Sequence, residues 1–147
     1  MMLPLAACNS QTIDPAVKKA GLERSAEIAK KSRVEGYKAV KAILDVYVSN
    51  LPGKLEGFVS NNYMPSKQEF INHVEQNALD KTITNIEVIV DNATFVQGIF
   101  AVNFDWNRSY MPKGSASQTI DSGTTNFVFV KEADGWRLMQ INGSDIF

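Results

Sequence analysis

The sequence has little cysteine, no long apolar run and almost no net charge. It has one cysteine, Cys8, in 147 residues, which excludes a disulfide within the chain. No run approaches the roughly 20 apolar residues that a helix needs to span a bilayer. The net charge is −1, and no basic run is longer than Lys30-Lys31. Domains that bind nucleic acid usually carry a basic patch or stripe, so we expect no nucleic-acid partner.

Familiar catalytic motifs are also missing. The sequence contains no Gly-x-Ser-x-Gly elbow, no P-loop, no Gly-x-Gly-x-x-Gly and no paired cysteines. His73 is the only histidine, and a zinc site needs several nitrogen or sulfur ligands. The sequence therefore predicts no metal and no cofactor, and it assigns no catalytic residue.

The surroundings of Cys8 are informative. Leu5-Ala6-Ala7-Cys8 is followed by polar residues, and this resembles a bacterial lipobox, in which the cysteine thiol receives the lipid. A signal peptide normally has a basic start and about 7–15 apolar residues, so we expect the true start upstream of Met1. The alternative is a lone thiol near the terminus. The prediction divides the chain into a truncated signal peptide (1–8), a tether (9–14) and one domain (15–147).

The first half of that domain has helical patterns. Asp14-Pro15 is a helix start, and the few small apolar residues after it predict a solvated or stalk helix over 15–31, with 15–33 as the outer limit. Residues 32–51 carry an apolar stripe at spacings of three and four. A short helix follows around 55–59. Ser66 and Glu69 form a capping box for a third helix.

From residue 82 the pattern alternates. Strands are predicted at 82–91, 94–107, 118–131 and 135–143. Asp91-Asn92 and Asp134-Gly135 are the expected tight turns, and residues 108–117 are the expected long hairpin loop. Helices followed by an antiparallel meander predict an α+β fold with the helices on one side of a curved sheet.

The element order, the Tyr63-Met64-Pro65-Ser66 turn and the closing Gly135-Trp136-Arg137-Leu138 strand resemble the NTF2-like superfamily, which includes ketosteroid isomerase-like and SnoaL-like domains. The resemblance covers about residues 34–147. It implies a cone that encloses a pocket, where the family's enzymes place an Asp, His or Tyr. A cystatin-like fold is the alternative.

That implied pocket directs attention to Tyr37, Tyr47 and Tyr63, whose hydroxyls would enter it or lie at its rim, and to His73, which fits a surface residue better than a base. In strand 94–107 one face is aromatic and aliphatic (Phe100, Val102, Phe104, Trp106). This row should form the core, so Asp105, on the opposite face, should point away from the pocket.

Two surfaces are expected to meet partners. The last two strands read as apolar on both faces, which predicts a cover over the second face: a homodimer through the sheet, common in NTF2-like proteins, or the stalk helix. The 108–117 loop places Tyr110 and Met111 at its tip, residue types suited to interfaces, although a plain connecting loop explains it as well.

Together these features favour a cell-envelope lipoprotein that acts as a non-enzymatic binding or assembly module. Its expected location is the periplasmic side of the outer membrane if the host is Gram-negative. Its expected partners are the membrane, through lipid on Cys8, a second copy and an envelope protein. The alternatives are a structural subunit of an envelope or secretion complex, and a small-molecule isomerase or dehydratase of ketosteroid isomerase type, which rests on fold analogy alone.

Overall fold

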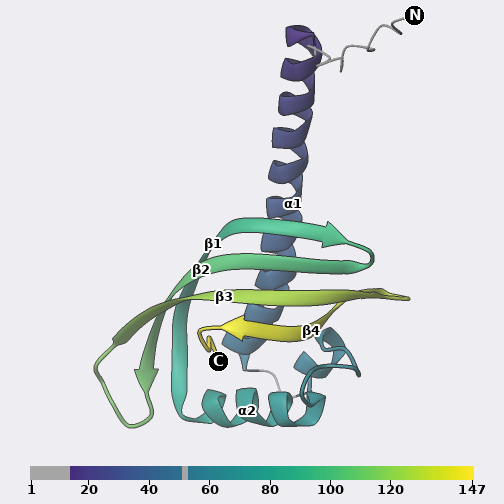
Figure 1. Ribbon diagram of the computed structural model, residues 1–147. Helices are drawn as coiled ribbons and strands as arrows, with labels where there is room; N and C mark the ends of the chain where they lie inside the picture. The colour runs from purple at the N-terminus through teal and green to yellow at the C-terminus, as the bar shows by residue number, and fades with distance from the viewer. Residues whose placement is uncertain (1–13, 51–52) are drawn as a thin grey trace, which may run out of the picture.

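The computed structural model describes residues 14–50 and 53–147. Two helices and a helical turn precede a sheet of four antiparallel strands in the order β1-β2-β3-β4. The elements are α1 (Pro15–Ser49), η1 (Leu55–Phe58), α2 (Lys67–Leu79), β1 (Lys81–Val96), β2 (Ile99–Pro112), β3 (Thr119–Glu132) and β4 (Gly135–Gly143). The sheet curves around one side of α1, and α2 closes the end of the cone (Figure 1). The α+β prediction is confirmed.

Helix α1 is one continuous helix of 35 residues, where the sequence predicted two. The Asp14 side chain accepts from the Ala16 amide at 2.9 Å, and Asn50 ends the helix with a left-handed φ of 47°. The residues around position 31 include no proline or glycine, so nothing stops the helix there. No helix in the described ranges has the length and apolar character to span a membrane.

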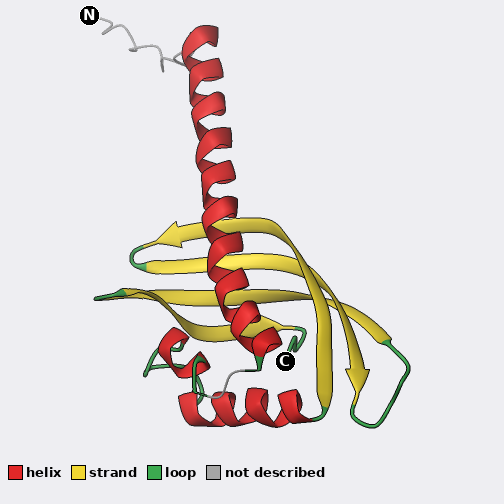
Figure 2. Ribbon diagram, turned by 180° about the vertical axis from the view of Figure 1, so that it is seen from behind, coloured by secondary structure: helices red, strands yellow, loops and turns green. Residues whose placement is uncertain are grey.

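The first half of α1 projects past β1 as a free stalk (Figures 1 and 2). Its residues up to Lys31 are exposed, and ion pairs Lys19–Glu23 and Lys31–Glu27, at 4.0 and 3.7 Å, lie along its surface. The stalk leaves the sheet at its β1 edge and does not fold over the outer face. The alternative in which the stalk covers that face is therefore wrong.

The second half of α1 lies directly on the inner face of the sheet. A Cβ at Gly36 would lie 3.0 Å from Val102 Cγ1 and 3.1 Å from Ala93 Cβ, so glycine allows a close approach that a larger residue would permit only if these side chains moved. The buried stripe then runs through Val40, Ile43 and Leu44.

The first hairpin turns later than the sequence predicted. β1 continues through Asp91-Asn92 to Val96, and the turn is Gln97-Gly98, with φ of 47° and 78°. Two successive residues with positive φ are what the tightest hairpin turn requires. The polar pair at 91–92 instead marks a bulge, where the register shifts between Val90 and Asn92.

The loop at 108–117 is also shorter than predicted. β2 runs to Pro112 and β3 begins at Thr119, because Arg108 and Tyr110 pair across the strands with Asp121 and Thr119. Tyr110 and Met111 are thus half-buried strand residues rather than the tip of a loop.

The core lies between the inner face and α1. The predicted inner row of β2 is confirmed, because all four of its side chains are buried. Asp105 is exposed on the outer face, as predicted. Leu44 and Phe104 are buried, whereas Trp136 is only half-buried.

One further correction concerns β4. Phe127 pairs with Ile141 but Phe129 pairs with Leu138, a register shift of one residue. This bulge returns Ile141 to the inner side, where it packs against the core. The sequence placed Ile141 and Leu138 on opposite faces, so the outer face is less apolar than predicted.

The assignment of inner and outer faces of the sheet predicts how substitutions on each face change stability. Phe104→Ala removes a side chain with no exposed surface and should lower the free energy of unfolding by about 3–5 kcal/mol. Ile89→Ala, at an outer-face position 70% exposed, should change it by less than about 0.5 kcal/mol. Chemical denaturation measures both, and equal losses would contradict the assignment of faces.

Candidate functional site

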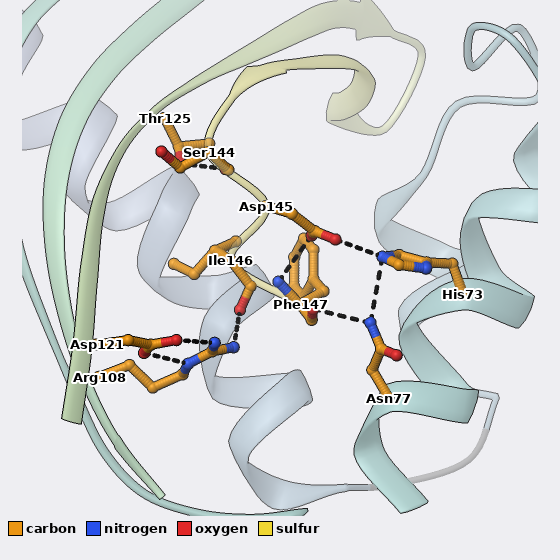
Figure 3. Close-up of polar contacts among 9 residues, drawn as sticks. All are labelled: His73, Asn77, Arg108, Asp121, Thr125, Ser144, Asp145, Ile146 and Phe147. Carbon is orange, nitrogen blue, oxygen red and sulfur yellow. Dashed lines mark hydrogen bonds and ion pairs between the residues drawn. The ribbon is translucent and has the colours of Figure 1, made fainter. Parts of the chain in front are cut away.

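The interior of the cone is occupied by the chain itself. After β4, residues 144–147 turn inward between the sheet, α1 and α2 (Figure 3). The turn depends on Gly143, whose φ is +90° and where a Cβ would meet the Thr124 carbonyl oxygen at 2.6 Å. Ile146 is fully buried and Phe147 is 4% exposed. We call Ser144–Phe147 the inserted segment.

Side chains from the cone hold the main-chain carbonyls of this segment. Thr125 Oγ1 donates to the carbonyl of residue 144 at 2.7 Å, Arg108 Nη1 to that of residue 146 at 2.6 Å, and Asn77 Nδ2 to that of residue 147 at 2.9 Å. The donors come from β3, β2 and α2 (Figure 3). The segment is therefore bound along its length by three separate elements of the fold.

The ring of Phe147 fits among three other aromatic rings. Tyr47 on α1 and Phe70 on α2 meet it edge-on, with centroids at 5.0 and 5.5 Å. Phe127 on β3 stacks nearly parallel at 6.1 Å. Such pairs stabilise a buried aromatic beyond the area they bury, so this box is the main apolar anchor of the segment.

Arg108 is the central polar residue of the site. Only 4% of it is exposed, and its Nε donates to Asp121 at 2.9 Å while Nη2 forms a second bond to the same carboxylate. Burial by itself lowers the pKa of Arg108, but Asp121 and nearby Tyr47 together offset this effect and the pKa is raised. The guanidinium stays charged, and its charge is matched by one carboxylate.

Two of the predicted tyrosines line this interior. The Tyr47 hydroxyl is buried without a hydrogen-bond partner among the described residues, and burial raises its pKa against the opposing effect of nearby Arg108. Tyr63 stacks on Phe70 at 4.5 Å. Burial, and secondly the Asp145 carboxylate, raise the pKa of Tyr63 to about 12. Both hydroxyls are therefore neutral donors at physiological pH.

His73 lies at the mouth of the cone. Its Nε2 is 2.6 Å from Asp145 Oδ2 and 3.2 Å from Asn77 Nδ2, and about half of its side chain is exposed. The histidine therefore links α2 to the inserted segment at the surface.

The other predicted positions lie apart from this site. Tyr37 is exposed on α1, and Met111 is near the end of β2. Tyr110 is the exception, because its ring centroid lies 5.0 Å from the Arg108 guanidinium. Cys8 lies outside the described residues. In the parts of the chain that the structure describes, no group of three or more His, Cys, Asp or Glu side chains is placed to hold a metal ion.

Sequence analysis missed the inserted segment and its donors. The available signal was the apolar pair Ile146-Phe147, which follows Gly143 just beyond the last predicted strand. No sequence pattern marks Asn77 and Thr125 as donors. Their role depends on how α2, β2 and β3, which are distant in the sequence, come together in the fold.

The outer face of the sheet carries a second unexpected feature. Asn103 Nδ2 donates to Asn92 Oδ1 and Asn126 Nδ2 to Asn103 Oδ1, each at 2.8 Å, and Asn142 Nδ2 donates to Asn126 Oδ1 at 3.2 Å. This asparagine ladder joins all four strands. Half-buried Val128 lies beside it on β3, so the face is mixed rather than charged.

A separate open hollow of about 260 Å³ lies between α1, η1 and the sheet. Its floor is aromatic, with Phe100, Phe129 and Trp136. The charges at its rim are already paired: Glu35 with Lys38 at 3.5 Å, and Arg137 with Asp134.

Comparison with known proteins identifies the fold. No model of a protein family matches the sequence, and no curated protein matches it at a significant level. Solved structures do. A ketosteroid isomerase-like protein from Erwinia carotovora atroseptica matches with TM-score 0.63 and 13% identity, covering 75% of this chain and 92% of that one. An NTF2-like superfamily protein from Salmonella enterica serovar Typhimurium matches with TM-score 0.61 and 13% identity, covering 78% and 91%.

The fold is NTF2-like. The neighbours thus decide between the two folds that the sequence left open. The association domain of C. elegans CaMKII shares the NTF2-like arrangement, with TM-score 0.55, 10% identity and coverage of 81% of this chain and 99% of that one. At these identities the likeness concerns the fold alone.

The site predicts an alkaline transition. Because the pKa of Tyr63 is raised to about 12 in the folded chain from about 10 in the unfolded one, its contribution to stability is complete below pH ~10 and is lost as the pH rises toward 12. Tyrosinate absorbance should show a step near pH 12 that Tyr63→Phe removes and Tyr37→Phe leaves. A titration without that step in the wild type would contradict the burial of Tyr63.

Proposed function

We propose that the chain is a non-enzymatic binding and assembly module of the cell envelope. The observation that carries this proposal is the inserted segment, because Ile146 and Phe147 fill the part of the cone around Arg108. What the domain offers to other molecules is therefore its peptide-holding interior and its outer surfaces.

The ionisable groups of the interior also support a binding role. Arg108 and Asp121 neutralise each other, and His73 faces the surface at the mouth of the cone. A general base must reach a proton of the bound substrate, and in both arrangements the ionisable group is already bonded to a partner within the protein. The alternative, an isomerase of ketosteroid isomerase type, is supported only by the likeness of fold to the Erwinia protein.

The stalk supports a place at a membrane surface. In this proposal lipid on Cys8 anchors the chain, on the periplasmic side of the outer membrane if the host is Gram-negative. Residues 15–31 of α1 then act as a spacer of about 25 Å, since a helix rises about 1.5 Å per residue. Exposed ion pairs along this spacer suit a helix surrounded by water.

The outer face is the surface that we propose for assembly. Its polar groups are tied to one another in the asparagine ladder, so covering them leaves few unpaired donors, and Val128 adds apolar area beside them. A second copy is the proposed partner. An envelope protein on the same face, as in a structural subunit of a secretion complex, is the alternative. The association domain of C. elegans CaMKII is a fold neighbour named for assembly.

The anchor has a direct test. Expressed in a bacterium behind a lipoprotein signal leader, the wild-type protein should partition into membranes and incorporate a palmitate analogue, and Cys8→Ser should abolish both. Stable anchoring needs the several acyl chains of a lipoprotein cysteine, because one chain binds only marginally. Wild-type protein that is unlabelled and remains in the soluble fraction would contradict the anchor.

Assembly through the outer face has a separate test. Val128→Glu places a charge beside the ladder and should weaken self-association at least about tenfold, because desolvating an unpaired charge at an interface is costly. Leu79→Glu, at an exposed apolar position at the end of α2, is the matched control and should leave the dimer intact. Sedimentation equilibrium measures both. A monomeric wild type, or equal effects of the two variants, would rule out a homodimer through this face.

A further inference from the structure

The inserted segment occupies the cone in the manner of a bound ligand. We propose that the cone is a peptide-binding site, filled here in cis by Ser144–Phe147. In trans it binds a short extended peptide in which an aliphatic residue precedes an aromatic one. The inference rests on the proposed function only in treating the domain as a binding module, and it names the ligand class of that module.

The first argument is the chemistry of the donors. Thr125 and Arg108 donate to peptide carbonyls of the segment, and Asn77 donates to the main-chain oxygen of residue 147. Every peptide presents main-chain oxygens regardless of its side chains. The Arg108 charge is already balanced by Asp121. A neutral acceptor such as a peptide carbonyl therefore suits this position better than a second carboxylate, whose charge would be buried without a counterion.

The second argument is the pattern of burial along the segment. The aromatic box receives Phe147, and Ile146 is fully buried beside it. Asp145 points outward, with more than half of its side chain exposed (Figure 3). The site therefore selects an aliphatic and an aromatic side chain at positions 146 and 147, and at position 145 it favours a side chain that can bond His73 at the mouth.

The third argument is how the segment is attached. Its one main-chain bond to the sheet is from the Ser144 amide to the Thr124 carbonyl, at 2.9 Å, and Gly143 is the bend before it. The described contacts of residues 145–147 are made with side chains, and the buried Tyr47 hydroxyl beside them lacks a partner.

The test removes the segment's apolar side chains and supplies them in trans. In the full chain carrying Ile146→Ser and Phe147→Ser, the peptide acetyl-Gly-Ser-Asp-Ile-Phe-amide should bind and shift the NMR signal of the Trp106 indole N–H. That group donates to Thr125 Oγ1 at 2.8 Å, next to the carbonyl of residue 144. The Trp136 indole, near the other end of the sheet, is the internal reference. The peptide acetyl-Gly-Ser-Asp-Ser-Ser-amide should cause no shift.

The wild-type chain should bind the same peptide more weakly than the double variant does. Its tethered segment competes at an effective concentration in the millimolar range or above, so we expect at least about tenfold weaker apparent binding than in the double variant. If the double variant does not fold alone, the first peptide must restore a cooperative thermal transition that the control peptide does not restore.

A paired substitution tests the site geometry. Asn77→Asp, in the double-variant background, replaces the donor to the terminal carbonyl by an acceptor of the same shape. It should weaken the peptide at least about tenfold, because one hydrogen bond is lost and an oxygen now faces an oxygen. Asn72→Asp adds the same charge on the exposed side of α2 and should leave binding unchanged.

Three outcomes overturn the proposal: neither a shift nor a restored transition with the peptide, equal effects of the two aspartate variants, or a shift produced by decanoate and not by the peptide. The last would assign the cone to small apolar acids. Since these measurements use purified chain without membranes, their failure leaves the anchor and the outer-face dimer standing. Failure of those two would likewise leave the peptide result intact.

Discussion

The architecture of the cone depends on one buried cation. Arg108 is almost fully enclosed, and a guanidinium in that position must have partners, because an unpaired buried charge is far more costly than any single contact can offset. Asp121 supplies the countercharge from the neighbouring strand, and the carbonyl of residue 146 supplies a further acceptor. The pairing of β2 with β3 and the inward path of the inserted segment are therefore linked through one side chain.

Around that cation the packing is aromatic and close. Phe127 contacts the rings of both Phe104 and Phe147, so the sheet core and the segment's anchor are continuous. Thr125, just before it, accepts from the Trp106 indole and donates to the carbonyl of residue 144. Polar and apolar contacts on β3 thus hold the same few residues, which explains how a short segment without sheet pairing keeps a defined place.

Much of the fold follows from local pattern. The alternation in β2 assigned the buried row and the outward direction of Asp105 correctly, because four successive positions on one face, from Phe100 to Trp106, are apolar. Asp14 and Ser66 were identified as helix caps, and both accept the expected amide bonds. These features depend on neighbours in the sequence, which is why the sequence alone reveals them.

The features that sequence analysis missed depend on competition between alternative turns or on contacts between residues far apart in the sequence. Asp91-Asn92 is a good turn pair, but Gln97-Gly98 forms the turn, because β1 can continue pairing with β2 up to it. The bulge in β4 shifts one face by a residue, and period-two counting cannot anticipate an extra residue. The asparagine ladder and the donors to the inserted segment appear only once the strand register is known.

The unbroken course of α1 gives the domain a fixed orientation. The exposed stalk and the buried half that lies on the sheet are parts of one helix, without a bend or linker between them (Figure 2). A helix turns about 100° and rises about 1.5 Å with each residue. The number of residues in the stalk therefore sets two things: the rotation of the ladder-bearing face about the helix axis relative to the first turn of α1, and its distance from that turn. A rotation of the first turn of the helix therefore rotates the sheet with it.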